Sequence, residues 1–280
     1  MSIVSGTLYI VATPIGNLGD MSSRALEVLR GVDCIACEDT RHTAHLLNHF
    51  SIPTKTLACH DHNERQVTEK FIAMLRDGQS VALVSDAGTP LISDPGYHLL
   101  RQAHAAGITV SPVPGASALI AALSASGLAT DRFVFEGFLP AKTAARQGYI
   151  KSLLSESRTL IFYESSHRIL ACLDDLVAGF GGERKATLAR EITKRFETIK
   201  QANLAELKAF CQADVQQQKG EFVLMVEGAE QHRDHAETER ILRLLLQELP
   251  LKQAAALASK ITGEQKNQLY QQALQWRDQE

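Results

Sequence analysis

The chain has 280 residues, of which 45% are hydrophobic, and its formal net charge is -3. This length predicts two domains or one large α/β unit, and the acidic balance argues against nucleic-acid binding by bulk charge attraction. Neither a signal sequence nor an apolar run of the length of a membrane helix, ~20 residues, is present. The cysteines form no disulfide framework, so we expect reduced thiols in a soluble, cytoplasmic protein.

Short apolar runs alternate with helical patterns over the first half of the chain. Such runs, bounded by turn-forming residues, are typical of buried strands. Successive strand and helix units predict a mainly parallel sheet with helices on both faces. The predicted strands are Leu8 to Ala12, Cys34 to Cys37, Thr56 to Cys59, Val81 to Val84 and Ile108 to Val110.

A polar cluster follows each of these strands, and the richest one lies within Ser80 to Gly96. There the strand opens into a loop that holds Asp86, Gly88 and Asp94 together with two prolines. Glycine lets the backbone approach a ligand, proline fixes φ, and carboxylates hold hydroxyl or ammonium groups. Because parallel strands end at one edge of a sheet, we predict a ligand site there; a solvent-exposed turn is the alternative.

The pattern restarts after Gly127 and predicts a second α/β domain with a mixed sheet, including a charged strand near Phe196 to Ile199. We place the domains at 1–127 and 128–232, with a helical module at 233–280. The second domain carries a dense group of cations, which is either a solvated face or a surface that contacts phosphate. These cations are Arg184, Lys185, Arg190, Lys194, Arg195 and Lys200.

Three helical patterns form the tail of the chain. The segment Thr262-Gly-Glu-Gln265 has the form of a capping box and predicts the start of the third helix. Two helices joined by a short turn resemble a helix-turn-helix module. This is only a weak nucleic-acid signal, because most such pairs are packing units.

Other common motifs do not fit the sequence. The dinucleotide-binding fingerprint and the P-loop are both missing. His60 and His62 are two residues apart on a segment predicted to be extended, so they point to opposite sides, and we expect no metal site. Ser117 lacks the glycine that a nucleophile elbow requires two residues later, where Leu119 stands.

Blocks along nearly the whole chain resemble the ribosomal RNA small-subunit 2'-O-ribose methyltransferase I family, within the tetrapyrrole-methylase-like S-adenosylmethionine methyltransferases. The resemblance implies two α/β domains with S-adenosylmethionine in the cleft between them, a homodimer, and methylation of a decoding-centre cytidine in 16S rRNA. The blocks include Thr13-Pro-Ile-Gly-Asn-Leu18, Glu38-Asp-Thr-Arg41, His60-Asp-His-Asn-Glu64, Ser85-Asp-Ala-Gly-Thr-Pro90, Gly137-Phe-Leu-Pro140, Phe162-Tyr-Glu-Ser165, Ala189-Arg-Glu191 and Lys219-Gly-Glu221.

The resemblance also suggests roles for particular residues. The expected cofactor-binding residues are Asp86, Ala87, Gly88, Thr89, Ile92, Ser117 and Ala118, with Ile15, Tyr163 and Ala189 as further candidates. A ribose hydroxyl is a poor nucleophile and must be oriented, for which the candidates are Glu38, Asp39 and Arg41. The expected RNA-contacting residues are His60, His62, Asn63, Glu164, Arg168 and Arg190.

Two other functions stay open at this stage. A precorrin or porphyrin C-methyltransferase could use the same scaffold, although it would not need the cation group or the helical tail. A ligand-sensing regulator could bind nucleic acid through the tail. The net charge argues against it, as do the five polar clusters at the edge of the sheet, which are more than ligand sensing requires.

Overall fold

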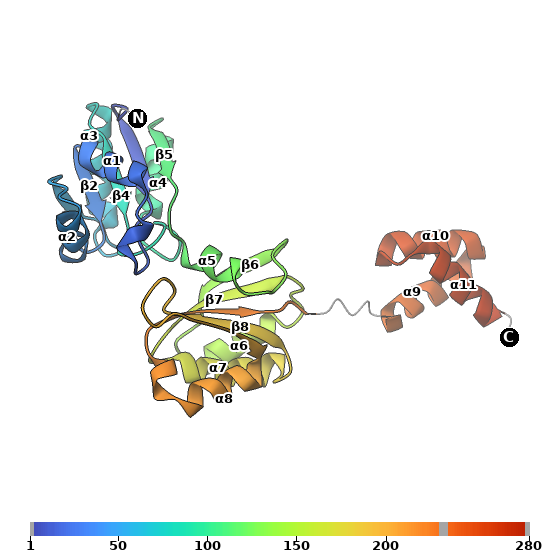
Figure 1. The fold of residues 1–280 in the computed structure, drawn as a ribbon. Helices are drawn as coiled ribbons and strands as arrows, with labels where there is room; N and C mark the ends of the chain where they lie inside the picture. Colours follow the sequence, from blue (N-terminus) through green and yellow to red (C-terminus); the bar gives the residue numbers. More distant parts are fainter. Residues whose placement is uncertain (1–2, 230–234, 278–280) are drawn as a thin grey trace. The chain divides into compact units, whose positions relative to one another are not determined.

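The computed structural model describes residues 3–229 and 235–277, which form two compact units that divide after Gly228 (Figure 1). The first unit holds two five-stranded sheets with their helices, and the second holds three helices. Both sheets lie in one unit, whereas the sequence places a boundary at 127/128 between them. That boundary and the one at 232/233 stay predictions.

The first sheet is parallel throughout, as predicted, with the order β3-β2-β4-β1-β5. Its strands are β1 (Thr7–Val11), β2 (Cys34–Cys37), β3 (Thr56–Ala58), β4 (Val81–Val84) and β5 (Thr109–Val113). Every residue of β1, β2 and β4 is buried, because helices cover both faces of the sheet.

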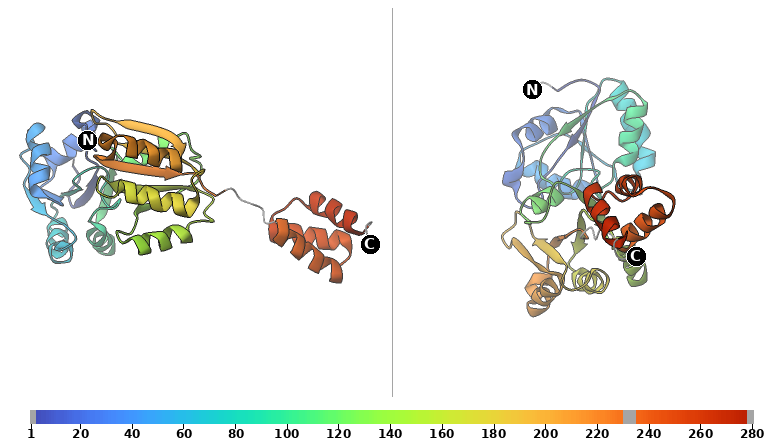
Figure 2. Two further views of the ribbon diagram at one scale, coloured as in Figure 1. Left: turned by 90° about the horizontal axis from the view of Figure 1, so that it is seen from below. Right: turned by 90° about the vertical axis from the view of Figure 1, so that its right-hand side faces the viewer.

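Two helices pack on each face of this sheet (Figure 2). On one face lie α1 (Ser23–Gly31) and α2 (Thr40–His49), and on the other α3 (Glu64–Arg76) and α4 (Tyr97–Ala105). All five polar clusters therefore emerge at the carboxyl edge of the sheet, as the sequence predicts. One short 3-10 helix, η1 (Leu18–Asp20), follows the first cluster.

The fifth strand is longer than predicted. We expected it to end at Val110, before Pro112, but β5 continues to Val113, with Pro112 in register with Ile10. Since β5 is an edge strand, a residue without an N–H is tolerated there. The carbonyl of Pro112 also accepts a hydrogen bond from Arg24 Nη2 at 2.6 Å.

The second sheet is mixed, as predicted, with the order β6-β7-β10-β8-β9 and one parallel pair, β6 with β7. Its strands are β6 (Phe133–Phe138), β7 (Thr159–Ser165), β8 (Lys185–Arg190), β9 (Thr198–Asn203) and β10 (Glu221–Val226). Figure 1 shows α5 (Ala118–Ser124) on one face and three helices on the other. These three are α6 (Thr143–Ser152), α7 (Ile169–Phe180) and α8 (Leu204–Ala213); a 3-10 helix, η2 (Val215–Gln218), follows α8.

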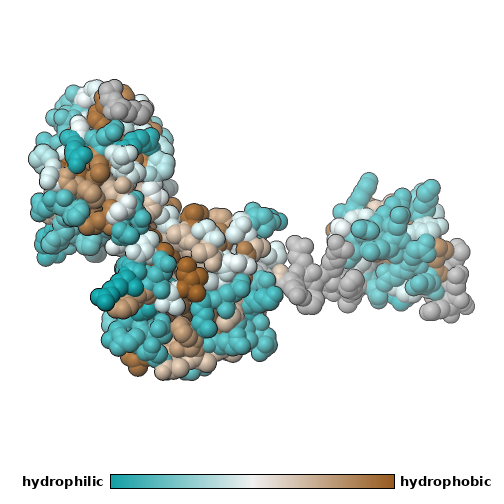
Figure 3. All heavy atoms as spheres, in the orientation of Figure 1, coloured by the Kyte–Doolittle hydropathy of each residue, from teal (hydrophilic) through white to brown (hydrophobic). Residues whose placement is uncertain are grey.

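The helix α5 links the two sheets in one hydrophobic core. It follows the last strand of the first sheet, yet Leu119, Ala122 and Leu123 pack against Ile161 and Val223 of the second. Figure 3 shows apolar surface around this junction. A helix that the sequence assigns to the first domain therefore completes the core of the second.

A second difference concerns β9, which we predicted over Phe196 to Ile199. The strand begins at Thr198, and residues 191–197 form a loop. Glu191 and Thr193 both have positive φ, 50° and 68°, which a strand does not tolerate. The predicted charged strand is thus half loop and half strand.

A buried ion pair ties α6 to α7. Arg146 Nε lies 2.6 Å from Asp175 Oδ2, and their side chains are only 3% and 7% exposed. Asp175 Oδ1 accepts a bond from Gln147 Nε2 at 2.7 Å, and Arg146 Nη1 donates to the Ala141 carbonyl at 3.2 Å. The pair therefore also fixes the segment that follows β6.

The second unit is a bundle of α9 (His235–Glu248), α10 (Leu251–Thr262) and α11 (Lys266–Arg277). Its core holds Leu242, Ala255 and Leu269. The predicted capping box is wrong: Thr262 is the last residue of α10, and Gly263 caps that helix in the left-handed conformation. The Thr262 hydroxyl donates to the Ala258 carbonyl at 2.8 Å, so it belongs to the preceding helix.

All five cysteines are free and buried. In the part of the chain that the structure describes, none of the helices has both the length and the apolar character needed to cross a membrane. The same residues contain no cluster of His, Cys, Asp or Glu that could hold a metal ion.

Neighbouring aspartates on α7 allow a matched test of the buried pair. Asp175→Ala leaves Arg146 buried and uncompensated, so we expect the free energy of unfolding to fall by about 3–5 kcal/mol. Asp174→Ala removes an exposed pair with Lys208, 2.7 Å apart, and should cost at most about 1 kcal/mol. Urea unfolding of both variants checks this; equal losses would contradict it.

Candidate functional site

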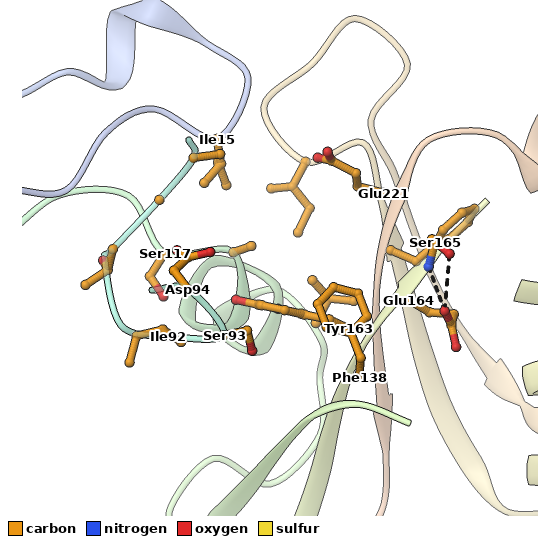
Figure 4. A pocket seen from close by; sticks show the side chains of 17 residues that line it. Ile15, Ile92, Ser93, Asp94, Ser117, Phe138, Tyr163, Glu164, Ser165 and Glu221 are labelled. Carbon is orange, nitrogen blue, oxygen red and sulfur yellow. Dashed lines mark hydrogen bonds between the residues drawn. The ribbon is translucent and has the colours of Figure 1, made fainter. Parts of the chain in front are cut away.

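A cavity of about 350 Å³ lies where the loops of the first sheet face the second sheet (Figure 4). The loops after β1, β4 and β5 contribute Ile15, Ala87, Gly88, Thr89, Ile92, Ser93, Asp94, Ser117 and Ala118. The second sheet and the loop after β8 contribute Phe138, Tyr163, Glu164, Ser165, Ile192, Glu221, Phe222 and Val223. Both sheets are therefore needed to enclose the cavity.

Hydrogen bonds join the three loops into one frame. Thr13 N donates to the Gly88 carbonyl at 2.8 Å, and Gly88 N donates to the Thr13 carbonyl at 3.1 Å. Thr89 Oγ1 donates to the Ala116 carbonyl at 3.0 Å, which attaches the loop after β5. Gly88 has φ of 83°, and a Cβ there would lie 3.3 Å from Ile15 Cγ2. A glycine is therefore required at this point of the cavity wall.

The loop after β4 contains strained backbone. Leu91 and Ser93 have φ of 76° and 67°, in the region that L-residues avoid. Such conformations cost about 1–3 kcal/mol each and persist where the surrounding structure enforces them, often at functional sites. Gly96, at the end of the loop, has φ of 119°, and a Cβ there would lie 2.6 Å from Leu83 Cδ2.

The opposite wall is aromatic. The Tyr163 ring lies 4.8 Å from the Phe135 ring and 5.7 Å from the Phe138 ring, both edge to face. Its hydroxyl accepts a bond from Leu119 N at 3.2 Å, at the start of α5. Burial raises the pKa of the Tyr163 hydroxyl, so it stays neutral. This wall suits a flat, partly apolar ligand.

Carboxylates gather on the other side of the cavity, where a hydrogen bond from Ser85 partly stabilises the ionised form of Asp94. Burial and then the charges of Asp86 and Asp61 raise the pKa of Asp94, which lines the cavity. Burial and then the charges of Asp86 and Asp94 raise the pKa of the nearby Glu38. Asp86 Oδ1 accepts a bond from Asp39 N at 3.2 Å. The ionised carboxylates repel one another, so the site favours a positively charged ligand.

A second cavity, of about 330 Å³, adjoins the first, and its lining includes two histidines, a lysine and carboxylates. It shares Ile15, Ala87 and Glu221 with the first cavity, so these residues form the partition. The remaining lining residues are Thr13, Pro14, Gly16, Leu18, His42, Thr43, His45, Leu46, Ser85, Asp86 and Lys194.

Lys194 reaches across from the second sheet to the first. Its Nζ lies 2.9 Å from both Glu191 Oε1 and Glu221 Oε2. A Cβ on Gly16 would lie 2.5 Å from Lys194 Cγ, so the lysine stem packs on the backbone of the loop after β1. Burial by itself would lower the pKa of Lys194, but its bonds to Glu191 and Glu221 have the larger effect. The pKa is therefore raised, and the ammonium stays charged.

The structure places most of the predicted cofactor-binding residues together. The first cavity is lined by Ile15, Ala87, Gly88, Thr89, Ile92, Ser117, Ala118 and Tyr163. Asp86 lines the second cavity instead. Ala189 is fully buried in β8 and packs in the core beneath α5, away from both linings.

The candidates for orienting a hydroxyl lie at the start of α2. Asp39 caps the helix, because its Oδ1 accepts from Arg41 N and His42 N at 2.8 and 3.4 Å. The Arg41 guanidinium, which is exposed, holds the pKa of Asp39 well below its usual range. None of Glu38, Asp39 and Arg41 lines a cavity, whereas His42 and His45 of the same helix do.

The first group of predicted RNA contacts lies at the end of β3, outside both linings. Asn63 closes a turn, accepting from His60 N at 2.8 Å and donating to the Ala58 carbonyl at 3.2 Å. The rings of His60 and His62 are 6.0 Å apart. His60 Nδ1 is buried with no partner among the described residues.

The second group is tied into the second sheet. Along β7, Tyr163 and Ser165 alternate with Glu164, whose Oε1 lies 3.1 Å from Arg168 Nε. Arg168 also donates to the Leu139 carbonyl. Arg190 is 6% exposed and donates to the Lys219 and Phe196 carbonyls at 2.6 and 3.0 Å. Arg190 thus bonds within the protein, whereas Glu164 Oε2 and Arg168 Nε are buried with no hydrogen-bond partner among the described residues. Glu164 also lines the first cavity.

The predicted cation group is spread over the second sheet. Arg184 donates to the Glu227 carbonyl at 3.1 Å, and Lys200 Nζ lies 5.0 Å from the Phe210 ring centroid. Arg195 is exposed, with its guanidinium 5.4 Å from the Phe196 ring centroid. The group therefore does not form one continuous phosphate-binding face.

Sequence reasoning missed several lining residues. Phe138, Ser165 and Glu221 stand inside motif blocks that we quoted, so the blocks themselves were a usable signal. Asp94 lies in the loop that we singled out. Ile192 and Val223 carry no signal of their own, because only the packing of the two sheets brings them to the cavity.

Comparisons with known proteins agree with this architecture. Residues 7–208 match the Tetrapyrrole (Corrin/Porphyrin) Methylases, and residues 232–277 match the RsmI C-terminal HTH domain. Among solved structures, the fold is similar to uroporphyrin-III-C-methyltransferase from Thermus thermophilus (TM-score 0.57, 20% identity, 79% of this chain and 94% of that one). It is also similar to diphthine synthase (TM-score 0.58, 16% identity, 79% and 89%).

Curated relatives match over almost the full length. A protein of Pseudomonas aeruginosa is 59% identical over 275 residues, covering 97% of this chain and 98% of its own. One of Vibrio cholerae is 55% identical over 274 residues, covering 96% and 94%. Both are named Ribosomal RNA small subunit methyltransferase I. With its methylase domain, its helical tail and this level of identity, the chain belongs to the ribosomal RNA small subunit methyltransferase I family and is a methyltransferase.

Proposed function

We propose that this enzyme transfers a methyl group from S-adenosylmethionine to the ribose 2'-hydroxyl of a decoding-centre cytidine in 16S rRNA. The names of the relatives support methylation of small-subunit rRNA as the reaction class. The observation that carries the proposal is the pair of adjoining cavities, one walled by aromatic and acidic groups and the other lined by Asp86, two histidines and Lys194, with a partition of three residues.

The first cavity fits S-adenosylmethionine. The glycine at 88 lets the backbone come close to a ligand, and the Tyr163 and Phe138 wall suits a flat base. The uncompensated carboxylate of Asp94 suits a cation. When bound, the cofactor supplies a methyl group on a positively charged sulfur. The residues that would hold it are the eight predicted ones that line this cavity, together with Asp94.

The second cavity would receive the ribose. Lys194 stays protonated and can hold an oxygen or a phosphate, but it cannot serve as the base. Asp86 and Glu221 are the lining carboxylates that can accept a proton from the hydroxyl. Asp39 would act indirectly: it caps α2 and so positions His42 and His45. Glu38 and Arg41 would set the charge at the rim of the site.

The wider assembly follows the family. We infer that the enzyme works as a homodimer in the cytoplasm on the assembled small subunit. The helical unit would add RNA contacts, since it matches a helix-turn-helix domain.

The first experiment offers labelled S-adenosylmethionine with small subunits that lack the modification, with naked rRNA, and with a porphyrinogen precursor. We expect label in 16S rRNA as an alkali-resistant 2'-O-methyl nucleotide, and more of it in assembled subunits. Label only in the tetrapyrrole would overturn the substrate. Label in rRNA on a base would overturn the 2'-hydroxyl as acceptor.

Two glycines provide a matched test of the cofactor cavity. Gly88→Ala places a side chain at φ of 83° against Ile15 and should displace the cavity wall, lowering S-adenosylmethionine affinity about tenfold or more. Gly107→Ala meets the same strain at φ of 68°, with nothing within 4 Å, and should lose only stability. Calorimetric titration with thermal unfolding checks both variants. Unchanged S-adenosylmethionine affinity in Gly88→Ala would show that this loop does not bind the cofactor.

The raised pKa of Asp94 predicts opposite effects on stability and binding. Because folding disfavours its ionised form, Asp94 contributes stability at low pH that is lost as the pH rises through its folded pKa. Asp94→Asn should therefore raise the free energy of unfolding at pH 7.

The same variant should bind S-adenosylmethionine about three- to tenfold more weakly, and S-adenosylhomocysteine, which lacks the sulfonium charge, almost normally. In the wild type the preference for S-adenosylmethionine over S-adenosylhomocysteine should decrease as the pH falls. Because the pKa of Asp94 is raised, the decrease should begin at a pH above the range in which carboxyl groups usually titrate. Titration with both ligands gives the ratio, with the exposed Asp131→Asn as control. A ratio that Asp94→Asn leaves unchanged counts against a sulfonium near this carboxylate.

A further inference from the structure

The loop at residues 191–197, between β8 and β9, is held rigidly although it is exposed. Its backbone closes two turns, from Lys194 N to the Glu191 carbonyl at 3.0 Å and from Glu197 N to the Lys194 carbonyl at 3.1 Å. Glu197 Oε2 also accepts from Thr193 N at 2.6 Å. The two positive φ values in the loop persist because these bonds enforce them.

The base of the loop is anchored from within the protein. Arg190, nearly buried, donates to the Phe196 carbonyl at 3.0 Å. Glu191 N donates to the Glu221 carbonyl at 3.0 Å, and Lys194 bonds to both carboxylates. The loop therefore has a defined shape before any ligand arrives.

This rigid frame directs an aromatic ring toward solvent. The Phe196 side chain is 65% exposed, and the Arg195 guanidinium lies 5.4 Å from its ring centroid. Lys200 of β9 and Phe210 of α8 form a similar pair, but the Phe210 ring is partly buried against the core. Exposed single rings are common on protein surfaces, so exposure shows only that the Phe196 ring is accessible to a ligand.

The loop also reaches the proposed acceptor cavity. Lys194 lines that cavity, and Phe196 follows only two residues later, which is a reach of about 7 Å at most. An RNA strand whose target nucleotide enters the second cavity must bring its neighbouring nucleotide past this loop. Aromatic rings and arginine planes are the groups on which unpaired RNA bases stack.

We propose that Phe196 and Arg195 form a stacking platform for the base next to the methylated nucleotide in single-stranded rRNA. The proposal rests on the proposed rRNA function and goes beyond it, since it assigns a contact outside both cavities. The exposed Arg195 favours a polyanion over an apolar protein surface, whereas Lys194 is already paired with Glu191 and Glu221. Stacking tolerates any base, so the platform holds the strand without reading its sequence.

The test separates stacking from simple apolar contact. Phe196→Leu keeps an apolar side chain but removes the ring, and Phe196→Trp keeps a ring. We expect Leu to raise KM for the subunit or rRNA substrate roughly five- to hundredfold, with kcat and S-adenosylmethionine affinity within twofold. Trp should restore the wild-type KM. The matched control is Phe133→Leu, at the end of β6 remote from the cavity-lining Phe138, which should change nothing.

Direct binding makes the result independent of catalysis. A labelled single-stranded RNA that carries the target sequence should bind Phe196→Leu more weakly than wild type by the same factor. Light scattering should give the same mass for both proteins. Equal RNA binding by wild type and Phe196→Leu would overturn the platform, and a change of oligomeric mass would show that the ring packs against a second copy. Failure of the wild type to methylate rRNA would instead overturn the proposed function.

Discussion

The site depends on the antiparallel bridge between Thr13 and Gly88. Parallel strands bring their loops to one edge, but adjacency alone does not give those loops a common shape. The bridge joins the loops after β1 and β4, and Thr89 adds the loop after β5. Both backbone groups of residue 88 are used in the bridge, and its φ excludes a side chain without strain. The bridge therefore sets the shape of the first cavity, its separation from the second cavity, and the access of a ligand to the backbone at Gly88.

Charge is treated differently at the site and in the scaffold. In the second sheet the buried Arg146 faces Asp175 and the buried Glu164 faces Arg168, whereas the buried Arg190 is held by backbone carbonyls. Beside the first cavity Asp94 and Glu38 lie near other carboxylates, and their pKa values are raised. Such an arrangement destabilises the protein at neutral pH and is relieved by a cationic ligand. Buried charges in the scaffold have partners within the protein, whereas the carboxylates at the site are left for a ligand to neutralise.

The two sheets contribute different chemistry. Loops of the first sheet supply carboxylates and a backbone that a ligand can approach closely. The second sheet supplies the aromatic rings, and Lys194 reaches from it to the first sheet. The helix α5 makes this division possible, because it follows the first sheet and packs in the core of the second. Lys194 crosses back in the opposite direction and packs on Gly16. Tyr163 connects these features, since its hydroxyl meets the start of α5 while its ring lines the cavity.

The sequence by itself determined the strands, the parallel first sheet, the edge at which polar residues gather, and the family. These properties follow from local periodicity and from short motifs such as Ser85-Asp-Ala-Gly-Thr-Pro90, which act within a few residues of one another. It also named most residues of the first cavity, because those residues stand in such motifs. It did not show that Arg190 and Arg168 donate hydrogen bonds to backbone carbonyls. Nor did it show that Thr262 ends one helix and does not begin the next.

Only the tertiary structure decided which polar groups are satisfied and which face a cavity. Ile192, Val223 and Lys194 reach the site through the packing of one sheet against loops of the other. The loop between β8 and β9 takes the first half of a predicted strand because Arg190 and Glu221 hold it from outside its own segment. Partners distant in the chain leave no periodic trace in it, so the division between structural and ligand-facing side chains was settled by the packing of the two sheets.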